Sequence, residues 1–190
     1  MSLVPAWEIG LWNAWIFMLI DTATIPVFLR IARGKGSPSP ASTLAKMSRP
    51  RKAVLFASKA IFIPALVYSV FLPLELGTVW FYVGLPVAIA GLVMSKIVLV
   101  NWAMAPPDEP LTRGMYRYSR HPMYFTYFIF LIGVSLAAAS WVFLVYTVLI
   151  TALSFYFAPV EEAACLEKYG AAYRDYMNRT PRWPGMSKSG

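Results

Sequence analysis

Long apolar segments constrain this chain more than any other feature of its sequence. A bilayer core of about 30 Å requires about 20 apolar residues in a helix. Five segments approach or meet this length: Trp7–Leu29, Val54–Leu74, Thr78–Met104, Pro122–Ala139 and Trp141–Ala158. The chain of 190 residues is 58% hydrophobic with a mean hydropathy of +0.57, the composition of an integral membrane protein. The sequence predicts an all-α integral membrane protein with five transmembrane helices.

The segments between the predicted spans are polar or very short. Residues 30–52 form a linker rich in Gly, Pro and Ser, and Ser140 is nearly the whole loop between the last two spans. From Glu161 onwards, apolar and charged residues recur at helical spacing, which predicts an amphipathic C-terminal helix that contains Gly170. We expect a single membrane domain over 1–190, with three spans in 1–104, a catalytic and cofactor-binding region in 105–183 and a tail in 184–190.

The distribution of the net charge of +8 predicts an orientation. Lys and Arg outside the spans fall in three connections, within Arg30–Lys52, Arg113–Arg120 and Lys168–Lys188, whereas the opposite side carries Glu8 and Glu75. Because basic loops stay in the cytoplasm, we expect the N-terminus outside and the C-terminus inside. This distribution argues against nucleic acid as a partner. It favours the lipid bilayer.

Single reactive residues exclude several other classes of site. One cysteine, Cys165, excludes an internal disulfide, and together with one histidine, His121, it cannot build the usual Cys/His metal site. The start MSLVPAWEIG has no positive n-region and no small-residue cleavage site, so we expect the first span to be retained.

Three charged residues lie within the predicted spans, where an ionised group is costly unless it is paired or hydrated: Asp21, Lys59 and Lys96. Their similar depth allows Asp21 to pair with one lysine. Such a pair could lock the helices together, the lysines could reach toward the headgroups, or these residues could line an active-site cavity.

Unusual polar residues gather at the cytoplasmic ends of the later spans. His121 stands at or beside the N-cap of the fourth span, since Pro122 suits the first helical turn. A helix N-terminus favours a carboxylate, and Arg117 and Arg120 add positive charge. Glu161 and Glu162 supply the opposite sign. The residues favour a site for a ligand with both charges, with aromatic surfaces from Trp102, Tyr116, Tyr118 and Tyr124. Headgroup contacts, a helix start and simple salt bridges explain the same residues equally well.

The motifs themselves resemble a known family. The chain carries Gly114 and Tyr116, then RHPMY from Arg120 to Tyr124, then the Glu161–Glu162 pair, then Gly170, Tyr173 and Tyr176. This combination over about Asn101–Trp183 resembles the isoprenylcysteine carboxyl methyltransferase family, most of all a compact prokaryotic member.

The resemblance implies an integral membrane methyltransferase that uses S-adenosylmethionine, yields S-adenosylhomocysteine and has a cytoplasmic cofactor site. It implies cofactor contacts at Asn101, Asp108, Glu109, Pro110, Leu111, Tyr116, His121, Pro122, Met123, Tyr124 and Glu161, and catalytic roles for Arg120, Tyr124 and Glu162. The implied acceptor is a lipophilic or prenylated compound, with isoprenylcysteine as the type. Phe157 stands where eukaryotic members place a substrate-binding arginine, so Arg120 or another arginine would have to hold an acceptor carboxylate.

Methyl transfer to a carboxylate requires no general base, so the protein would chiefly position the reactants and exclude water. A phospholipid N-methyltransferase is the first alternative, with Glu162 or His121 as a base. An NADPH-dependent sterol-type reductase, which typically needs a longer chain, and a non-enzymatic scaffold or small transporter are the others.

Overall fold

The computed structural model describes residues 7–34 and 48–184. The described part is helical and contains no extended strand: α1 (Trp15–Gly34), α3 (Arg49–Val70), α4 (Val79–Ala103), η1 (Gly114–Arg117, a 3-10 helix), α5 (Pro122–Ala137), α6 (Trp141–Tyr169) and α7 (Ala171–Arg179). The predicted all-α fold is confirmed for these residues. Residues 35–47 of the predicted linker and 185–190 of the predicted tail lie outside the described residues, as does the side chain of Lys59.

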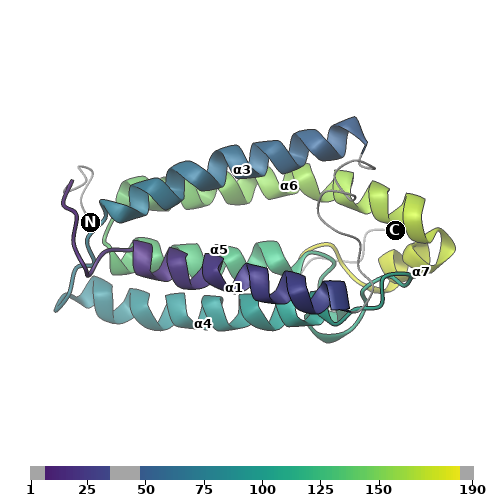
Figure 1. Cartoon of the computed structure of the whole chain (residues 1–190), viewed down its shortest axis with the longest axis horizontal. Helices are drawn as coiled ribbons and strands as arrows, with labels where there is room; N and C mark the ends of the chain where they lie inside the picture. The colour runs from purple at the N-terminus through teal and green to yellow at the C-terminus, as the bar shows by residue number, and fades with distance from the viewer. Residues whose placement is uncertain (1–6, 35–47, 185–190) are drawn as a thin grey trace.

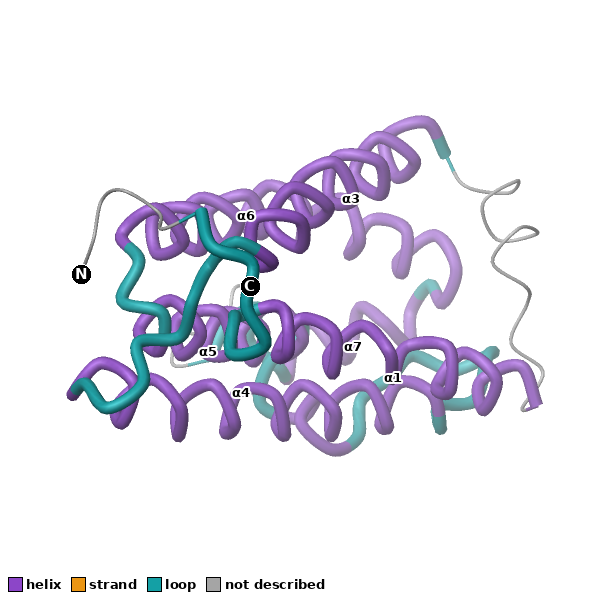
Figure 2. Tube along the Cα trace, turned by 60° about the vertical axis from the view of Figure 1, so that its left-hand side comes forward, coloured by secondary structure: helices purple, strands orange, loops and turns teal. Residues whose placement is uncertain are grey.

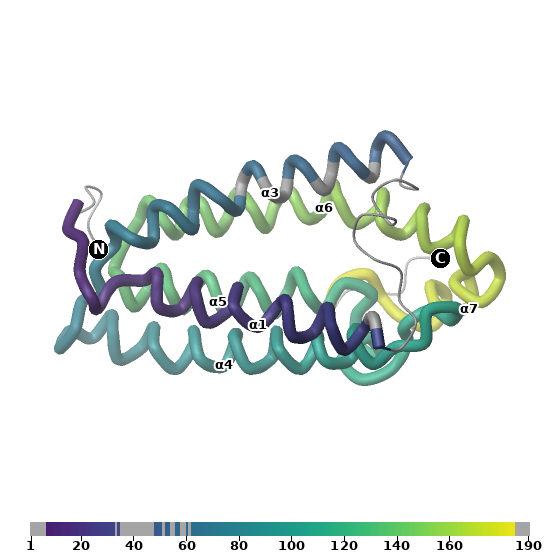
Figure 3. Tube along the Cα trace, in the orientation of Figure 1, coloured from purple at the N-terminus to yellow at the C-terminus, as the bar shows by residue number. Residues whose placement is uncertain are grey.

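Five long helices run lengthwise in two layers, with α3 and α6 in one layer and α1, α4 and α5 in the other (Figures 1 and 2). Successive helices alternate in direction, as the colour gradient shows (Figure 3). One end of the bundle therefore collects the end of α4, the start of α5 and the end of α6. The short helices η1 and α7 lie at that same end.

Three of the helices are long and apolar enough to cross a membrane: α1 over Trp15–Ala32, α4 over Val79–Ala103 and α6 over Trp141–Tyr169. They correspond to the first, third and fifth predicted spans. Helix α5 is also apolar but has only 16 residues. The structure thus supports an integral membrane protein, with three candidate spans among the described residues.

The first helix begins later than the apolar pattern predicts, at Trp15 instead of Trp7. The preceding segment is held in a non-helical path by Asn13, whose Nδ2 donates hydrogen bonds to the carbonyl oxygens of Glu8 (2.6 Å) and Val70 (2.7 Å). Because these bonds tie the segment to the end of α3, the residues before Trp15 do not extend the helix, and the side chains of Ile9, Leu11 and Trp12 are largely exposed.

The last long helix continues further than predicted. Helix α6 passes through Pro159 and ends at Tyr169, whereas the sequence pattern places the end of the span at Ala158. Gly170, with a φ of 55°, stops it in a conformation that favours glycine, and α7 follows. The predicted amphipathic segment is therefore divided between the protruding end of α6 and the separate helix α7.

Helices α4 and α5 pack with their backbones in close approach. A Cβ atom on Gly91 would lie 2.3 Å from the backbone nitrogen of Phe130, and one on Gly133 would lie 2.1 Å from that of Ala88. Small residues let membrane helices gain packing contacts that larger side chains would prevent. This contact fixes the position of the α5 N-terminus, where the polar residues begin.

Candidate active site at the end of the bundle

His121 occupies the N-cap position of α5, with Pro122 at the first helical position as predicted. Its side chain does not cap the helix. It lies between the two carboxylates at the end of α6, with Nε2 3.2 Å from Oε1 of Glu162 and Nδ1 3.5 Å from Oε2 of Glu161. The imidazole is buried, so it connects the start of α5 with the end of α6.

Glu162 is the buried centre of the charged cluster. Nε of Arg120 lies 3.2 Å from its Oε1, and the Arg120 side chain is fully buried. Arg182 makes a forked contact, with Nε 3.0 Å from Oε1 and a terminal nitrogen 2.7 Å from Oε2. His121 is the third neighbour, so positive groups surround this carboxylate. A buried charge is tolerated only when it is paired in this way.

Glu161 is in a different environment from its neighbour. Its side chain is 41% exposed, and its Oε1 accepts a hydrogen bond of 2.9 Å from the hydroxyl of Tyr124. The Glu161 side chain is therefore partly open to solvent, whereas Glu162 is enclosed by protein groups.

The chain after α7 returns across the start of α5. The Ser119 hydroxyl donates to the carbonyl of Arg182 (2.8 Å), and the backbone N–H of Arg120 donates to that of Pro181 (3.0 Å). The ring of Trp183 then lies over the cluster, with centroids 5.6 Å from His121 and 6.2 Å from Tyr124. This C-terminal segment supplies both a cation and an aromatic wall.

The pKa values of two cluster cations are raised. Burial lowers the pKa of His121, but hydrogen bonds to Glu161 and Glu162 and the charges of both carboxylates outweigh it, so the net pKa lies above the ordinary 6.5. The hydrogen bonds from Arg182 to Glu162 raise the pKa of the guanidinium against a smaller effect of burial. Both shifts favour the charged forms, which hold the cluster together.

Helix η1 is fixed by α7 and by the end of α4. The Tyr176 hydroxyl donates to the carbonyl oxygen of Tyr116 at 2.7 Å, and burial raises the pKa of both phenols. Asn101 packs against Gly114, whose φ is 61° and which has no room for a Cβ atom. The Nδ2 atom of Asn101 is buried, and among the described residues it has no hydrogen-bond partner.

A cavity of about 650 Å³ adjoins the cluster. Its walls come from all five long helices, and most of its lining is apolar. Trp102, Met123 and Tyr124 line it, and Tyr124 is also hydrogen-bonded to Glu161. A lipophilic chamber thus meets the polar cluster at one side chain.

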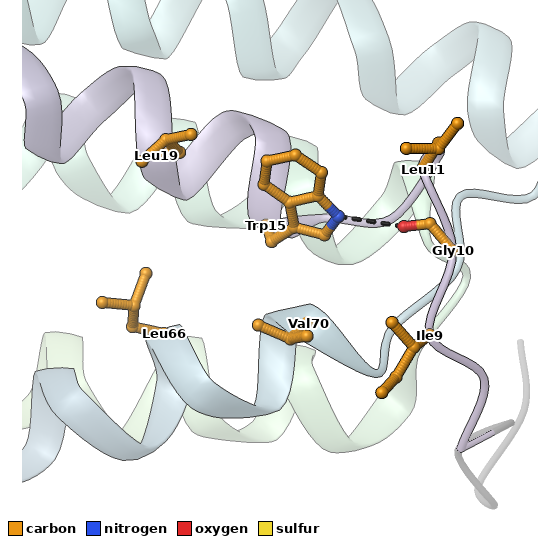
Figure 4. A pocket seen from close by; sticks show the side chains of 7 residues that line it. All are labelled: Ile9, Gly10, Leu11, Trp15, Leu19, Leu66 and Val70. Carbon is orange, nitrogen blue, oxygen red and sulfur yellow. Dashed lines mark hydrogen bonds between the residues drawn. The ribbon is translucent and has the colours of Figure 1, made fainter.

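A second cavity of about 460 Å³ lies near the start of α1 and the end of α3 (Figure 4). It is lined by apolar side chains, and the indole of Trp15 donates its N–H to the carbonyl of Gly10 at 3.0 Å. Its described lining offers no charged or nucleophilic side chain, so the first cavity is the better candidate site.

Within that first cavity, Asp21 and Lys96 form the ion pair that was predicted from their similar depth in the apolar segments. Nζ of Lys96 donates to Oδ1 of Asp21 at 2.5 Å and to its backbone oxygen at 2.9 Å. Both residues also line the cavity, so the helix-locking and cavity-lining interpretations apply together.

The structure does not bring every predicted site residue into the cluster. Asp108 and Glu109 are exposed in the loop after α4, and no hydrogen bond or ion pair joins either side chain to the described residues of the cluster. The loop is held from α6 instead, where Nζ of Lys168 donates to the carbonyl of Pro107 at 2.6 Å. Arg117 is exposed as well.

Sequence reasoning missed Ser119, Arg182 and Trp183. The only signal for the last two was a basic–aromatic pair shortly after the predicted amphipathic helix.

The architecture and this site define an integral membrane protein with a charged cluster at the mouth of a lipophilic cavity. A comparison with protein families shows the family of the chain. The model of the phospholipid methyltransferase family matches residues 72–172, more than half of the chain. The chain therefore belongs to the phospholipid methyltransferase family, a family of membrane methyltransferases related to the isoprenylcysteine carboxyl methyltransferases. No curated protein and no solved structure matched the chain significantly.

Members of this family typically use S-adenosylmethionine as the methyl donor. The residues present fit such a group in three respects. Glu161 offers a half-exposed carboxylate for an amine or hydroxyl, and Tyr124 and Trp183 offer aromatic faces for a cation. The buried, unpartnered Nδ2 of Asn101 offers a donor close to η1.

Proposed function

We propose that this chain is an S-adenosylmethionine-dependent methyltransferase that methylates a lipophilic acceptor at the cytoplasmic face of the membrane. The observation that carries the proposal is the double role of Tyr124, which lines the apolar cavity and donates a hydrogen bond to Glu161. A water-soluble donor and a lipid-soluble acceptor need such a junction to meet.

We further propose that α3 and α5 also cross the membrane, giving five spans with the N-terminus outside. The alternating directions of the five helices support this count. The positive-inside rule then assigns the end with η1 and α7 to the cytoplasm, because the described basic residues Arg113, Arg117 and Arg179 lie there.

The bound cofactor would supply a methyl group activated on a sulfonium. Glu161 would hold its amine or ribose hydroxyls, and the N-terminus of α5 at His121 and Pro122 would face its carboxylate. Asn101, Tyr116, Met123 and the loop from Asp108 to Leu111, with Glu109 and Pro110, are the further contacts that the family resemblance implies. Arg120 and Glu162 would act as positioning residues, because their side chains hold His121 and Arg182 in place.

The first acceptor class that we propose is a lipophilic carboxylate of the isoprenylcysteine type. A carboxylate oxygen is already a nucleophile at neutral pH, so no side chain has to accept a proton. The residues would align the reactants and keep water out. Phe157 lines the cavity, and the Arg120 side chain is buried against Glu162, so a carboxylate would need another cation near the mouth.

The second class is a lipophilic amine, which the phospholipid methyltransferase match favours. A neutral amine enters an apolar cavity more readily than a carboxylate does. After its lone pair takes the methyl group, the nitrogen must lose a proton. Of the two predicted bases, Glu162 is enclosed by cations, which leaves His121 to accept the proton.

The first test is calorimetric binding of S-adenosylhomocysteine to the detergent-solubilised chain, with the variants His121→Ala and Glu161→Gln. We expect binding by the wild type and its loss in both variants. A folded wild type that binds no S-adenosylhomocysteine would refute the methyltransferase proposal.

The second test separates the two acceptor classes. Membranes are incubated with S-adenosylmethionine carrying a radioactive methyl group and either an isoprenylcysteine or phosphatidylethanolamine. Mild alkali then releases volatile methanol from a methyl ester but leaves an N-methyl group on the non-volatile headgroup. Volatile label supports the carboxylate, and alkali-stable label supports the amine.

A further inference from the structure

The cavity contains polar groups that neither the methyl donor nor the transferred methyl group requires. Asp21, Lys96 and Tyr127 line it among apolar side chains, deeper in the bundle than Tyr124. Three hydroxyl residues also line it: Ser95, Thr151 and Ser154. What these groups can bind follows from the partners that they already have.

The three hydroxyls are satisfied within their own helices. Each donates to a backbone carbonyl three or four residues earlier, at 2.8 Å for Ser95, 2.7 Å for Thr151 and 2.6 Å for Ser154. They therefore present no spare donor to the cavity.

Two other groups do present donors. Lys96 has three N–H groups and uses two of them on Asp21. The hydroxyl of Tyr127 is buried and has no hydrogen-bond partner among the described residues. Because buried polar groups are nearly always hydrogen-bonded, the unpartnered hydroxyl of Tyr127, on a residue that lines this cavity, points to an acceptor atom that arrives with a ligand. The third N–H of Lys96 is a second donor on a residue that lines the same cavity.

The charge of the site restricts that acceptor atom. Asp21 already neutralises Lys96, so an anionic ligand group would meet an adjacent carboxylate and an apolar wall. A neutral oxygen avoids both costs. A carbonyl oxygen, with two lone pairs, can accept from both donors at once.

We propose that Lys96, held by Asp21, and Tyr127 form a subsite for a neutral carbonyl oxygen in the body of the methyl acceptor. The proposal rests on the proposed function, because it takes this cavity as the acceptor chamber. Tyr127 lies one helical turn beyond Tyr124, about 4.5 Å along α5, and Lys96 lies about 9 Å along α4 from Trp102. The acceptor then carries a carbonyl within its apolar body, beyond the end that is methylated. An acceptor with a purely hydrocarbon tail would leave both donors unpaired.

The experiment measures binding alone, without a methyl donor. Dioctyl ketone and heptadecane have equal chain lengths and differ only in the carbonyl. Their affinities for the full-length chain in dodecyl maltoside are measured with radiolabelled compounds, and the carbonyl stretching band of the bound ketone is recorded by infrared difference spectroscopy.

Two variants remove the donors with little loss of packing. Tyr127→Phe keeps the ring that contacts Phe62 and Phe130. The double variant Asp21→Asn/Lys96→Met removes both charges together, so neither is left buried alone. Tyr68→Phe is the matched control, because its hydroxyl is also buried without a partner among the described residues but does not line this cavity.

We expect the wild type to bind the ketone roughly tenfold more tightly than the alkane, the value of about one hydrogen bond. The carbonyl band should lie at a lower wavenumber than in empty micelles. Both effects should weaken in Tyr127→Phe and in the double variant and persist in Tyr68→Phe. Equal binding of ketone and alkane, or a preference kept in full by both variants, would overturn the subsite. Because the binding assay contains no methyl donor, a failure here would count against the subsite and would not bear on the methyltransferase proposal.

Discussion

Neutralising the two adjacent glutamates should have opposite effects on stability and on ligand binding. Glu162 is enclosed by Arg120, Arg182 and His121, whereas Glu161 is 41% exposed and accepts one hydrogen bond from Tyr124. The change Glu→Gln keeps the size of either side chain and removes only its charge. We expect Glu162→Gln to destabilise the fold and Glu161→Gln chiefly to weaken binding of S-adenosylhomocysteine.

The size of the stability effect depends on which neighbouring cations can lose their charge or move into water when Glu162 is neutralised. In Glu162→Gln, His121 can lose its proton and Arg182, with a side chain 34% exposed, can turn toward water. Arg120 is fully buried and keeps its charge, so it loses its counter-ion. Breaking a buried pair in this way costs about 3–5 kcal/mol. At roughly 2–4 °C per kcal/mol for a chain of this size, Tm should fall by about 6–20 °C.

Glu161→Gln keeps an oxygen that can accept the hydrogen bond from Tyr124 and removes the charge that lies 3.5 Å from Nδ1 of His121. A partly exposed pair of this kind contributes up to about 1 kcal/mol, or roughly 2–4 °C in Tm. Both variants are compared with the wild type by thermal unfolding in the same detergent and by calorimetric binding of S-adenosylhomocysteine at a temperature where all remain folded. The reasoning would be refuted if Glu161→Gln lowered Tm as much as Glu162→Gln. It would equally be refuted if Glu161→Gln bound S-adenosylhomocysteine like the wild type.

Three further predictions concern the supports of the site. Because the pKa of His121 is raised above 6.5 in the folded state, its stabilising effect should be complete below about pH 6.5 and be lost as the pH rises through the raised value. Tm measured against pH should show this decline in the wild type and a smaller one in His121→Gln. The change Gly133→Ala places a methyl group 2.1 Å from the α4 backbone and should cost about 1–3 kcal/mol by thermal unfolding, while Gly34→Ala, with open space around it, should cost nothing. The change Tyr176→Phe removes the hydroxyl that donates a 2.7 Å hydrogen bond to the carbonyl of Tyr116. It should lower the free energy of unfolding by about 1 kcal/mol and speed proteolysis within η1. An unchanged rate of proteolysis would argue against the role of Tyr176 in holding η1.

The helices were largely predictable because their apolar runs are long, but their ends were not. Hydropathy alone predicts that the first helix begins at Trp7, because it contains no information about the hydrogen bond from Asn13 to Val70 on α3. Likewise it ends the last long helix near Ala158, where the apolar run stops, although the backbone continues to Tyr169. A polar stretch ends a predicted span but does not by itself end a helix.

The site was predictable in part for a similar reason. Motif position placed His121 and both glutamates at one end of the bundle, and in the structure the ring nitrogens of His121 lie 3.5 Å from Glu161 and 3.2 Å from Glu162. It could not reveal Arg182 and Trp183, because their role depends on the chain turning back after α7. Nor could it choose which lysine pairs with Asp21, a choice set by how α1 packs against α4.

The adjacent positions of Glu161 and Glu162 follow from the needs of a site at a membrane boundary. On one helix, consecutive side chains point about 100° apart, so one can face the protein while the next faces a ligand. The inward carboxylate draws Arg120, His121 and Arg182 together and thereby joins the start of α5, the end of α6 and the returning C-terminal segment. The outward one is then held beside Tyr124 by a frame that it does not itself have to maintain. Such a division would let the carboxylate that we propose as the ligand contact stay partly hydrated, which a single glutamate serving both purposes could not do.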